Sequence, residues 1–399
     1  MNAPIRVLHV MTDPVFGAIL LEPILRQQRE HGYRIEIAAG PGEAMGQLTR
    51  MGFPVHLIHV NRHLVSFAHF RALAELVRIT RRGRYDVIHL HNPITSVLGR
   101  IAARTAPRPI VFYHMHGSYW DSPRLSERLI FDYTERALRN FADNIITINS
   151  EDTDDLIRRG IKDAASITCL RVGSGGVDLA RFDPSAFTPE DRARTRQALG
   201  ISPSDFVVGF VGRLVEIKGI TDLVEAFSGV AGACERAKLV IVGSVLRSER
   251  DQETGPRVMR RAEEDPSLRG RVVFTGFRRD VPALMSTMDV LVMPSRQEHF
   301  GLVQAEAGAM SLPVISTDTR GGREAIENGR NGILVPVENP EVLREAILLL
   351  AEREDLRKRM AEAGRARACA LYDERRIFER INAAYERLLG ARAGGAALT

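Results

Sequence analysis

Two glutamates, Glu298 and Glu306, lie eight positions apart in the stretch SRQEHFGLVQAEAGAMSLPVIS, with Phe300, Gly301 and Leu302 between them. Carboxylates at such a spacing can perform acid/base chemistry, bind a metal ion or simply lie on a solvated helix face. The pattern predicts a strand, then a loop, then a helix that begins near Gly301. Glu298 therefore falls on the loop and Glu306 on the first turns of the helix, so the two carboxylates need not act as a pair.

The surroundings of Glu306 favour a binding role over a solvated helix face. Its helix reads LVQAEAGAM, which is otherwise apolar and predicts burial. A buried carboxylate without a partner is costly, whereas a carboxylate accepts well from the vicinal hydroxyls of a sugar. We therefore expect one glutamate to hold a donor sugar and the other a ribose, with the amides of Gly301 and Leu302 facing a phosphate.

A second motif, FVGRLVEIKG, places Arg213 and Lys218 five positions apart after a strand that ends at Gly212. Two cations at a strand-to-helix turn, beside the amides of a helix N-terminus, form an anion site suited to a diphosphate. The spacing does not match the P-loop pattern of nucleotide-binding proteins. From these residues alone, two exposed cations on a loop remain an open alternative.

Two further strand ends carry groups that could take part in a site. In STDTRGGREAIENGRNGILV, Gly321 and Gly322 form a turn before Glu324 that either makes room for a ligand or only makes the turn. In YHMHGSYWD, His116 precedes Gly117 at the end of a strand. A lone histidine is more often structural, but ligands bind at strand ends in open α/β sheets, so we expect a functional role for His116.

Strands and helices alternate along both halves of the chain, and this alternation predicts parallel sheets covered on both faces. We expect an α/β protein with two doubly wound, Rossmann-like domains that face each other across a cleft. The expected domains are 1–173 and 174–374, with a helix over 375–391 packing back on the first, a linker at 171–191 and a frayed tail after the helix. The predicted strands cover 5–11, 34–39, 85–91, 109–116, 144–150, 206–212, 238–244, 271–276, 290–295 and 312–318.

The composition is typical of a folded globular protein and argues against a membrane-spanning, a secreted or a disulfide-rich protein. The 399 residues are 44% hydrophobic and 26% charged, and no apolar run is long enough to span a bilayer. The N-terminus MNAPIRVLHVMTDP lacks the pattern of a secretory signal, and three distant cysteines argue against a disulfide framework or a zinc site. We therefore expect a cytoplasmic protein.

The positive charge of the chain is concentrated in its first half. The net charge is +5, and residues 1–175 hold 22 Lys and Arg against 17 Asp and Glu. Nine arginines fall between Arg62 and Arg108. These are either ordinary solvated helix faces or a basic surface that meets anionic lipid headgroups or an anionic substrate. Nucleic acid is not expected as a partner, because no aromatic residues are interleaved with the arginines in a known binding motif.

The three motifs occur in an order that resembles a known family. Gly-Arg-x4-Lys-Gly is followed by Pro-Ser-x2-Glu-x-Phe-Gly-x4-Glu and then by Gly-Gly-x-Glu. This order resembles the retaining GT-B glycosyltransferases often called family 4, and the match spans nearly the whole chain. The resemblance implies a GT-B fold, with a nucleotide-sugar donor bound by the C-terminal domain and an acceptor bound by the N-terminal domain.

The resemblance also implies roles for individual residues. Arg213 and Lys218 would bind the donor diphosphate and neutralise the leaving group. Glu298 would contact the sugar hydroxyls and Glu306 the ribose hydroxyls, while His116 would lie by the donor sugar and position its reacting face. The resemblance implies further donor-binding residues, and residues 276–278 among them would lie against the base. These residues are Gly17, Gly212, Gly276, Phe277, Arg278, Phe300, Gly301 and Leu302.

The chain departs from the family pattern in its first loop. Many members carry Gly-Gly there, whereas this chain has Phe16-Gly17-Ala18, and Gly17 remains the candidate for close approach to a ligand. A second feature, Asp-x-Asp in EDTDD, is the metal motif of a different glycosyltransferase fold. Here Asp152 and Asp154 follow the start of a predicted helix, where acidic side chains complement the helix dipole, so we expect no catalytic metal.

Two longer stretches, 86–104 and 135–156, resemble a subgroup that adds sugars to polyprenyl-diphosphate-linked intermediates of bacterial surface glycans. This likeness implies a retaining, metal-independent hexosyltransferase without a cofactor, using a UDP-sugar in preference to other donors. Its partners would be a glycan or lipid-linked acceptor and an anionic membrane, on the inner face of the plasma membrane. A transferase for a soluble acceptor in natural-product biosynthesis, and a sugar-nucleotide epimerase or phosphorylase on the same scaffold, remain alternatives.

Overall fold

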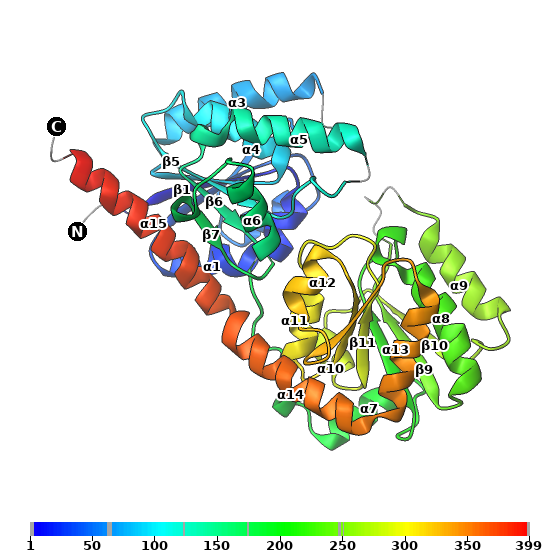
Figure 1. The fold of residues 1–399 in the computed structure, drawn as a ribbon. Coiled ribbons are helices and arrows are strands. Elements are labelled where there is room, and N and C mark those ends of the chain that lie inside the picture. The colour runs from blue at the N-terminus through cyan, green and yellow to red at the C-terminus, as the bar shows by residue number, and fades with distance from the viewer. Residues whose placement is uncertain are drawn as a thin grey trace. The chain divides into compact units, whose positions relative to one another are not determined.

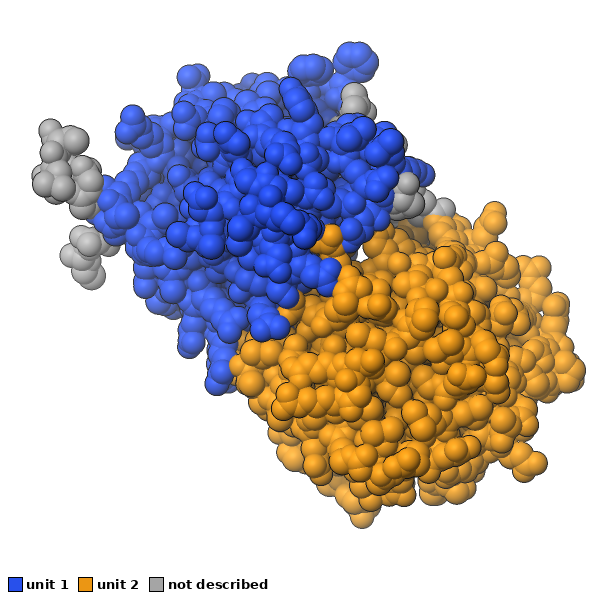
Figure 2. Space-filling model, viewed as in Figure 1, with its two compact units in different colours: residues 1–176, 374–399 blue, residues 177–373 orange. Residues whose placement is uncertain are grey.

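The computed structural model describes residues 4–61, 66–122, 124–173, 175–245, 249 and 251–396. The chain divides into two compact units, residues 1–176 with 374–399 and residues 177–373 (Figure 2). Each unit is an α/β layer structure of its own. Among the described residues, no helix combines the length and the apolar character that a membrane span requires.

The first unit is built on a parallel sheet with the strand order β3-β2-β1-β4-β5-β6-β7. Each strand pairs in parallel with its neighbours, and the order reverses between β1 and β4, which pair directly. The strands are β1 (Arg6–Met11), β2 (Arg34–Ala39), β3 (Val55–Leu57), β4 (Val87–His91), β5 (Ile110–Met115), β6 (Asn144–Thr147) and β7 (Ile167–Cys169). The main helices are α1 (Glu22–Glu30), α2 (Met45–Arg50), α3 (Ala68–Gly83), α4 (Pro93–Ala103), α5 (Leu125–Ala137), α6 (Ser150–Arg158) and α15 (Glu374–Ala396).

Helices cover both faces of this sheet, and its central strands are buried on both sides. Helices α3, α4 and α5 lie on one face, and α1 and α15 lie on the other (Figure 1). The last helix, α15, therefore belongs to the first unit although it ends the chain. Its Tyr385 is fully buried and contacts Phe112 on β5, with ring centroids 4.6 Å apart.

The second unit repeats the architecture with the strand order β10-β9-β8-β11-β12-β13, again all parallel. The strands are β8 (Phe206–Val211), β9 (Ala237–Val242), β10 (Val272–Gly276), β11 (Val290–Met293), β12 (Val314–Thr317) and β13 (Gly332–Val335). The helices are α7 (Pro189–Ala198), α8 (Ile220–Ala233), α9 (Thr254–Glu264), α10 (Val281–Met285), α11 (Leu302–Ala309), α12 (Arg320–Ala325), α13 (Pro340–Glu352) and α14 (Glu354–Leu371).

The strand order of the second unit reverses between β8 and β11, which pair directly. The helices that follow these two strands leave toward opposite faces of such a sheet, so a crevice opens at the carboxyl ends of the pair. The loops after β8 and β11 are the ones that carry the Arg213–Lys218 motif and the Glu298–Glu306 motif. The topology therefore places the two motifs next to one another.

The predicted α/β class with two doubly wound sheets is confirmed, while several local expectations are wrong. The expected linker at 171–191 ends in a helix, because Thr188 and Asp191 form a capping box at the start of α7. The expected frayed tail is helical as far as Ala396. Three short strands, β3, β7 and β13, were not expected, since three or four residues carry too little periodicity to be recognised.

One arginine of the basic first half is not on the surface. Arg100 on α4 is fully buried and donates two hydrogen bonds, at 2.9 and 2.8 Å, to the carboxylate of Glu135 on α5. Its guanidinium also lies 5.1 Å from the centre of the Tyr113 ring. Among the other described arginines of the stretch from Arg62 to Arg108, the side chains are exposed.

We expect Arg100→Met to lower the free energy of unfolding by about 3–5 kcal/mol, because it leaves the buried Glu135 carboxylate without its partner. The double variant Arg100→Met/Glu135→Leu should recover most of this loss, since no buried charge remains. Urea unfolding of the three proteins measures both effects. Equal stability of the single and double variants would contradict this account of the pair.

Candidate functional site

The second unit brings together a cation and a carboxylate from the two donor motifs. Lys218 ends a short 3-10 helix, Glu216–Lys218, that follows β8, and Glu298 lies on the loop after β11. Lys218 Nζ donates to Glu298 Oε2 at 2.5 Å, and the two side chains are 18% and 13% exposed. Both charged side chains are thus mostly buried but keep some contact with solvent.

Backbone contacts fix the three loops that meet here. Arg296 N donates to Ile217 O at 2.9 Å, which ties the loop after β11 to the loop after β8. Gly321 N donates to Glu298 O at 2.8 Å, which ties in the loop after β12. A side chain at Gly219 would place its Cβ 1.9 Å from Pro294 O, and φ there is +66°, so this close approach requires glycine.

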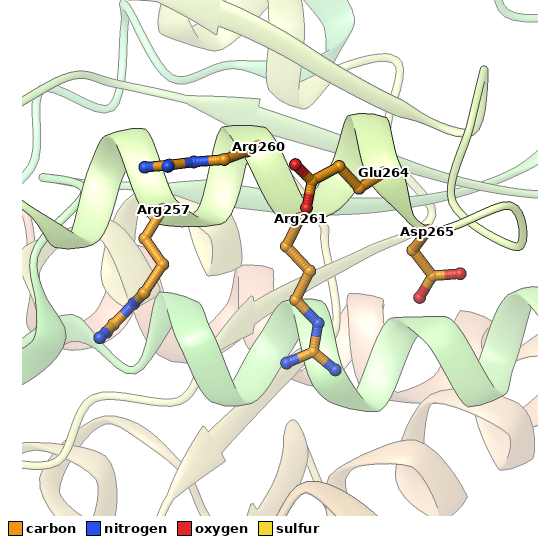
Figure 3. Close-up of a pocket in the computed structure, with 5 residues that line it drawn as sticks. All are labelled: Arg257, Arg260, Arg261, Glu264 and Asp265. Atoms are coloured by element: carbon orange, nitrogen blue, oxygen red, sulfur yellow. The ribbon is translucent and has the colours of Figure 1, made fainter.

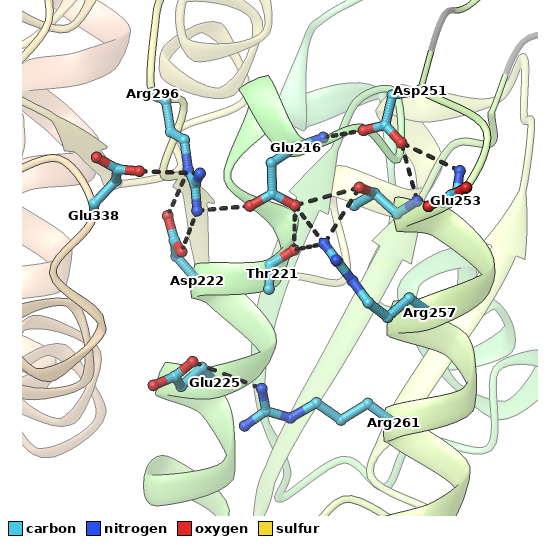
Figure 4. A network of polar contacts seen from close by, with 11 residues as sticks. Glu216, Thr221, Asp222, Glu225, Asp251, Glu253, Arg257, Arg261, Arg296 and Glu338 are labelled. Atoms are coloured by element: carbon cyan, nitrogen blue, oxygen red, sulfur yellow. Dashed lines mark hydrogen bonds and ion pairs between the residues drawn. The ribbon is translucent and has the colours of Figure 1, made fainter.

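An ion-pair network supports the same loops (Figure 4). The Arg296 guanidinium lies between three carboxylates, those of Glu216 at 2.6 Å, Asp222 at 3.0 Å and Glu338 at 3.0 Å. Glu216 also accepts from Thr221 and Arg257. Since Arg296 is two residues from Glu298 and Glu216 is two residues from Lys218, the network sets the spacing of the cation and the carboxylate.

Arg213 follows Gly212 directly after β8, as the sequence predicts. Its guanidinium pairs with the carboxylate of Glu249, which lies in the loop after β9. The Arg213 side chain is 43% exposed, so the pair is open to solvent and contributes little to stability. A more strongly charged anion such as a diphosphate can therefore replace Glu249 as the partner of Arg213.

Glu306 lies on the second turn of α11 and is partly exposed. Within the described residues, its carboxylate has no hydrogen bond or ion pair. The protein atoms around it remove most of its hydration, and this burial raises the pKa of Glu306 to about 7, while the charge of Arg181 acts in the opposite direction. A carboxyl group held in this way gains by accepting hydrogen bonds from a ligand.

The other donor candidates of this unit fall into two groups. Phe300 is buried and packs edge-on against Tyr372, with ring centroids 5.6 Å apart, so it anchors the loop before α11. Gly301 is the N-cap of that helix and Leu302 its first residue.

The second group follows β10 at the edge of the sheet. Gly276 ends the strand with φ +68°, Phe277 is 66% exposed, and Arg278 pairs with Asp280 at 2.5 Å. Arg181, which acts on the pKa of Glu306, donates to Arg279 O at 2.8 Å. This arginine therefore links the end of β10 to the surroundings of Glu306.

The first unit holds the two remaining candidates, His116 and Gly17. His116 directly follows β5, and Gly17 lies in a π-helix, Phe16–Leu20, after β1. The Phe16 ring meets the His116 ring edge-on at 4.6 Å, so the two candidate segments touch. A Cβ on Gly17 would lie 2.6 Å from Met11 Sδ, so packing against the sheet by itself accounts for the glycine.

The acidic segment after β6 has the structural role that its position predicts. Asn149 caps helix α6 by accepting from Asp152 N at 2.7 Å, and Asp152 lies in the first turn. Asp154 follows on the same helix. Glu324 of the Gly-Gly motif is buried in α12, where its carbonyl accepts from Arg367 at 2.9 Å.

Sequence reasoning missed the residues that hold the site in place. Arg296 falls in the loop predicted before the helix at Gly301, and no local pattern singles out Glu216, Asp222 or Glu249. A charged residue two positions before the motif residue Glu298 is the available signal for Arg296. The partners could not be paired with it from sequence, because Asp222 is 74 positions away along the chain.

A separate hollow of about 420 Å³ lies along α9 (Figure 3). Its lining is entirely charged and consists of Arg257, Arg260, Arg261, Glu264 and Asp265. None of the donor motif residues borders it. Arg257 and Arg261 also pair with Glu216 and Glu225 at 2.7 and 3.6 Å, which is the behaviour of a solvated helix face.

The Glu306 carboxyl predicts a pH-dependent stability of the unliganded protein. Because its pKa is raised in the folded state from 4.5 to about 7, ionisation of Glu306 opposes folding. The stabilising contribution of its neutral form is complete below about pH 4.5 and is lost as the pH rises through 7. Glu306→Gln should therefore raise the free energy of unfolding by about 1–3 kcal/mol at pH 8 and by much less at pH 5. Urea unfolding at both pH values checks this, and an equal effect at the two would refute it.

Residues 191–367 match the model of glycosyl transferases group 1, and residues 20–173 match that of the glycosyl transferase 4-like domain. A capsular polysaccharide biosynthesis glycosyltransferase, CapM of Staphylococcus aureus, is 24% identical over 372 residues, covering 92% of this chain and 94% of CapM.

Two further proteins are similar over most of their length. The UDP-Gal:alpha-D-GlcNAc-diphosphoundecaprenol alpha-1,3-galactosyltransferase of Escherichia coli is 26% identical over 294 residues, 73% of each chain. The structure of Anabaena Alr3699/HepE in complex with UDP superposes with a TM-score of 0.79 at 24% identity, covering 96% of this chain and 100% of that one. The two family models cover both units, and the chain belongs to the group 1 glycosyltransferases with the GT-B fold.

Proposed function

We propose that this glycosyltransferase transfers a hexose from a UDP-sugar to a polyprenyl-diphosphate-linked glycan intermediate, in the synthesis of a surface polysaccharide. The observation that carries the proposal is the Lys218–Glu298 pair at the reversal point of the second sheet. Lys218 and the nearby Arg213 suit a diphosphate, and Glu298 suits the hydroxyls of the attached sugar. The UDP complex of HepE and the activities of CapM and the galactosyltransferase support the donor and the pathway.

The proposed reaction retains the anomeric configuration and needs no metal ion. As the bond between the anomeric carbon and the diphosphate oxygen breaks, the negative charge grows on the diphosphate, where Arg213 and Lys218 stabilise it. The acceptor hydroxyl attacks from the same face of the sugar, and the departing diphosphate oxygen takes its proton. Glu298 and Glu306 hold the donor sugar and the ribose, and they transfer no proton.

A lipid-linked acceptor accounts for an unusual surface on the first unit. Helix α5 turns Phe131 and Glu135 toward the protein interior. Its opposite face exposes large apolar side chains at helical spacing, namely Leu125 at 59%, Leu129 at 61%, Ile130 at 44% and Tyr133 at 76%. Exposed arginines accompany them at 124, 128 and 136. An apolar stripe flanked by arginines is the pattern of a helix that lies in a membrane interface.

Two aromatic side chains extend this pattern to α3. Phe67 and Phe70, at the start of that helix, are 91% and 74% exposed, and Arg71, Arg78 and Arg82 on the same helix are exposed as well. Both α3 and α5 adjoin α4, through helix packing and through the Arg100–Glu135 pair. We propose that these helices hold the enzyme on anionic lipid at the inner face of the plasma membrane, where a polyprenyl-linked acceptor lies.

The function is tested by transfer from a radiolabelled UDP-sugar panel to an undecaprenyl-diphosphate-linked sugar in vesicles. We expect Arg213→Ala and Lys218→Ala each to lower kcat by about 100-fold or more, because each removes a charge that stabilises the leaving diphosphate. Arg260→Ala, which removes an exposed cation of the same unit, serves as the matched control and should keep full activity.

Each outcome of the transfer assay separates the proposal from its alternatives. Label in a water-soluble acceptor and not in lipid would identify a natural-product transferase. Interconversion of the donor sugar, or its release without any acceptor, would indicate an epimerase or a phosphorylase. Turnover within about twofold of the wild type in both cation variants would reject the diphosphate assignment.

The membrane proposal predicts co-sedimentation with phosphatidylglycerol vesicles and weak binding to phosphatidylcholine vesicles. Leu129→Ser/Ile130→Ser should reduce the partition coefficient by about tenfold or more, since burial of each side chain in the interface is lost. The control Ile157→Ser/Leu349→Ser removes two apolar side chains that are also exposed, at 42% each, and should bind as the wild type does. Equal losses in both double variants would contradict a specific role of α5.

A further inference from the structure

Five histidine side chains lie together along the middle and the carboxyl ends of three neighbouring strands of the first sheet. They come from β1, β4 and β5 and from the residue after β5, and their rings stack on one another with centroids 4.0 to 5.5 Å apart. The sheet order β1-β4-β5 brings them together, since their separation in the chain reaches 107 positions, from 9 to 116. The five are His9, His89, His91, His114 and His116.

Three of these histidines form a hydrogen-bonded chain that begins at Gln28 on α1. Gln28 Oε1 lies 2.8 Å from His9 Nε2. His9 Nδ1 lies 3.0 Å from His91 Nε2, and His91 Nδ1 lies 3.0 Å from His116 Nε2. Each ring thus uses both nitrogens in the chain until His116, whose Nδ1 is buried without a partner among the described residues.

The chain fixes which nitrogen of each ring carries its proton. An amide oxygen only accepts, so His9 Nε2 must donate to Gln28 and His9 Nδ1 must accept. His91 Nε2 therefore carries the proton in the hydrogen bond to His9 Nδ1. His91 Nδ1 must then accept, so His116 Nε2 carries the proton in the hydrogen bond between these two rings. One amide oxygen on α1 therefore determines the tautomer of a histidine three hydrogen bonds away.

The other end of Gln28 is held by the C-terminal helix. Gln28 Nε2 donates to Tyr385 Oη at 3.4 Å, and Tyr385 Oη lies 2.5 Å from His89 Nδ1. Because Tyr385 Oη accepts from the amide, its own proton goes to His89 Nδ1, and His89 also carries its proton on Nε2. All four rings then have the Nε2–H form, which is the more stable tautomer of a free histidine side chain. Exchanging the positions of the amide oxygen and nitrogen of Gln28 would force all four rings into the less stable Nδ1–H form.

The histidines of this hydrogen-bonded chain are neutral, so each ring has one donor and one acceptor nitrogen. Burial lowers the pKa of His9 to about 4, against a smaller opposing effect of Gln28, and burial lowers that of His116 to about 3. The pKa of His91 is also well below its usual value, because of burial and the neighbouring rings. The alternative of a metal ion fits less well. Two groups of three ring nitrogens lie within 4.8 Å, but each group contains nitrogens that already hydrogen-bond to one another, in His9 and His91 or in His91 and His116.

We propose that Gln28 and Tyr385 are positioning residues that hold His116 as a neutral ring with its proton on Nε2, through His9 and His91. His116 Nε2 is committed to His91 and Nδ1 is enclosed, so His116 enters the reaction with a fixed orientation and transfers no proton. The tautomer stands on the hydrogen bonds alone, whereas its effect on turnover rests on the proposed function, in which His116 lies by the donor sugar.

The experiment is long-range proton–nitrogen NMR of the full-length protein labelled with ¹⁵N-histidine, which identifies the protonated nitrogen of each ring. In the wild type, His9, His91 and His116 should all show Nε2–H. In Gln28→Met, which removes the amide oxygen at similar side-chain length, His116 should become a mixture of tautomers, and kcat should fall about 5- to 20-fold with KM within twofold.

Gln27→Met is the matched control, because Gln27 is the adjacent buried residue on α1 and bonds to Glu374 O, outside the chain. It should leave the tautomer of His116 and kcat as in the wild type. A wild-type spectrum with the proton of His116 on Nδ1 overturns the proposal even if Gln28→Met does not fold. So does an unchanged His116 tautomer in a folded Gln28→Met. If the wild type has no transferase activity but Gln28→Met still shifts the tautomer of His116, the hydrogen-bonded chain is supported and the proposed function is rejected.

Discussion

The reversal of strand order in each parallel sheet is the constraint on which the rest of the structure depends. At β8 and β11 the chain leaves two hydrogen-bonded strands toward opposite faces, so the two following loops meet at one edge with no helix between them. Lys218 and Glu298, 80 positions apart, come within 2.5 Å of each other for this reason. A site for a charged, hydroxylated ligand is then a consequence of topology combined with the residues that the loops carry.

The first sheet shows the same principle with different chemistry. Its reversal lies between β1 and β4, and the strand ends there carry stacked histidines in place of an ion pair. Burial keeps these rings neutral, so they act through hydrogen bonds and orientation and not through charge. Each unit therefore carries its own kind of group: accessible charges in the second unit, and neutral histidines of fixed orientation in the first.

Charge near the donor motifs is arranged in two groups that differ in role. Lys218, Glu298 and Arg213 hold partners that a ligand can displace. Beside them, Arg296 spans three carboxylates and fixes the distance between the loops. Such a framework lets Lys218 and Glu298 remain in place when their partners change, which is the preorganisation that electrostatic stabilisation of a leaving group requires.

The sequence by itself determined the fold class, the doubly wound sheets and the location of the donor motifs, because apolar strands, glycine turns and charged loop residues are local patterns. It also indicated that Glu298 and Glu306 have separate tasks, since one falls on a loop and the other on a helix. Only the tertiary structure decided which residues meet. Arg100 belongs to a basic stretch, yet its partner Glu135 makes it a core residue, and Gln28 reaches His116 through rings from two other strands. The physical reason is that burial and hydrogen-bond direction depend on neighbours in space, which strand order sets and which no local pattern records.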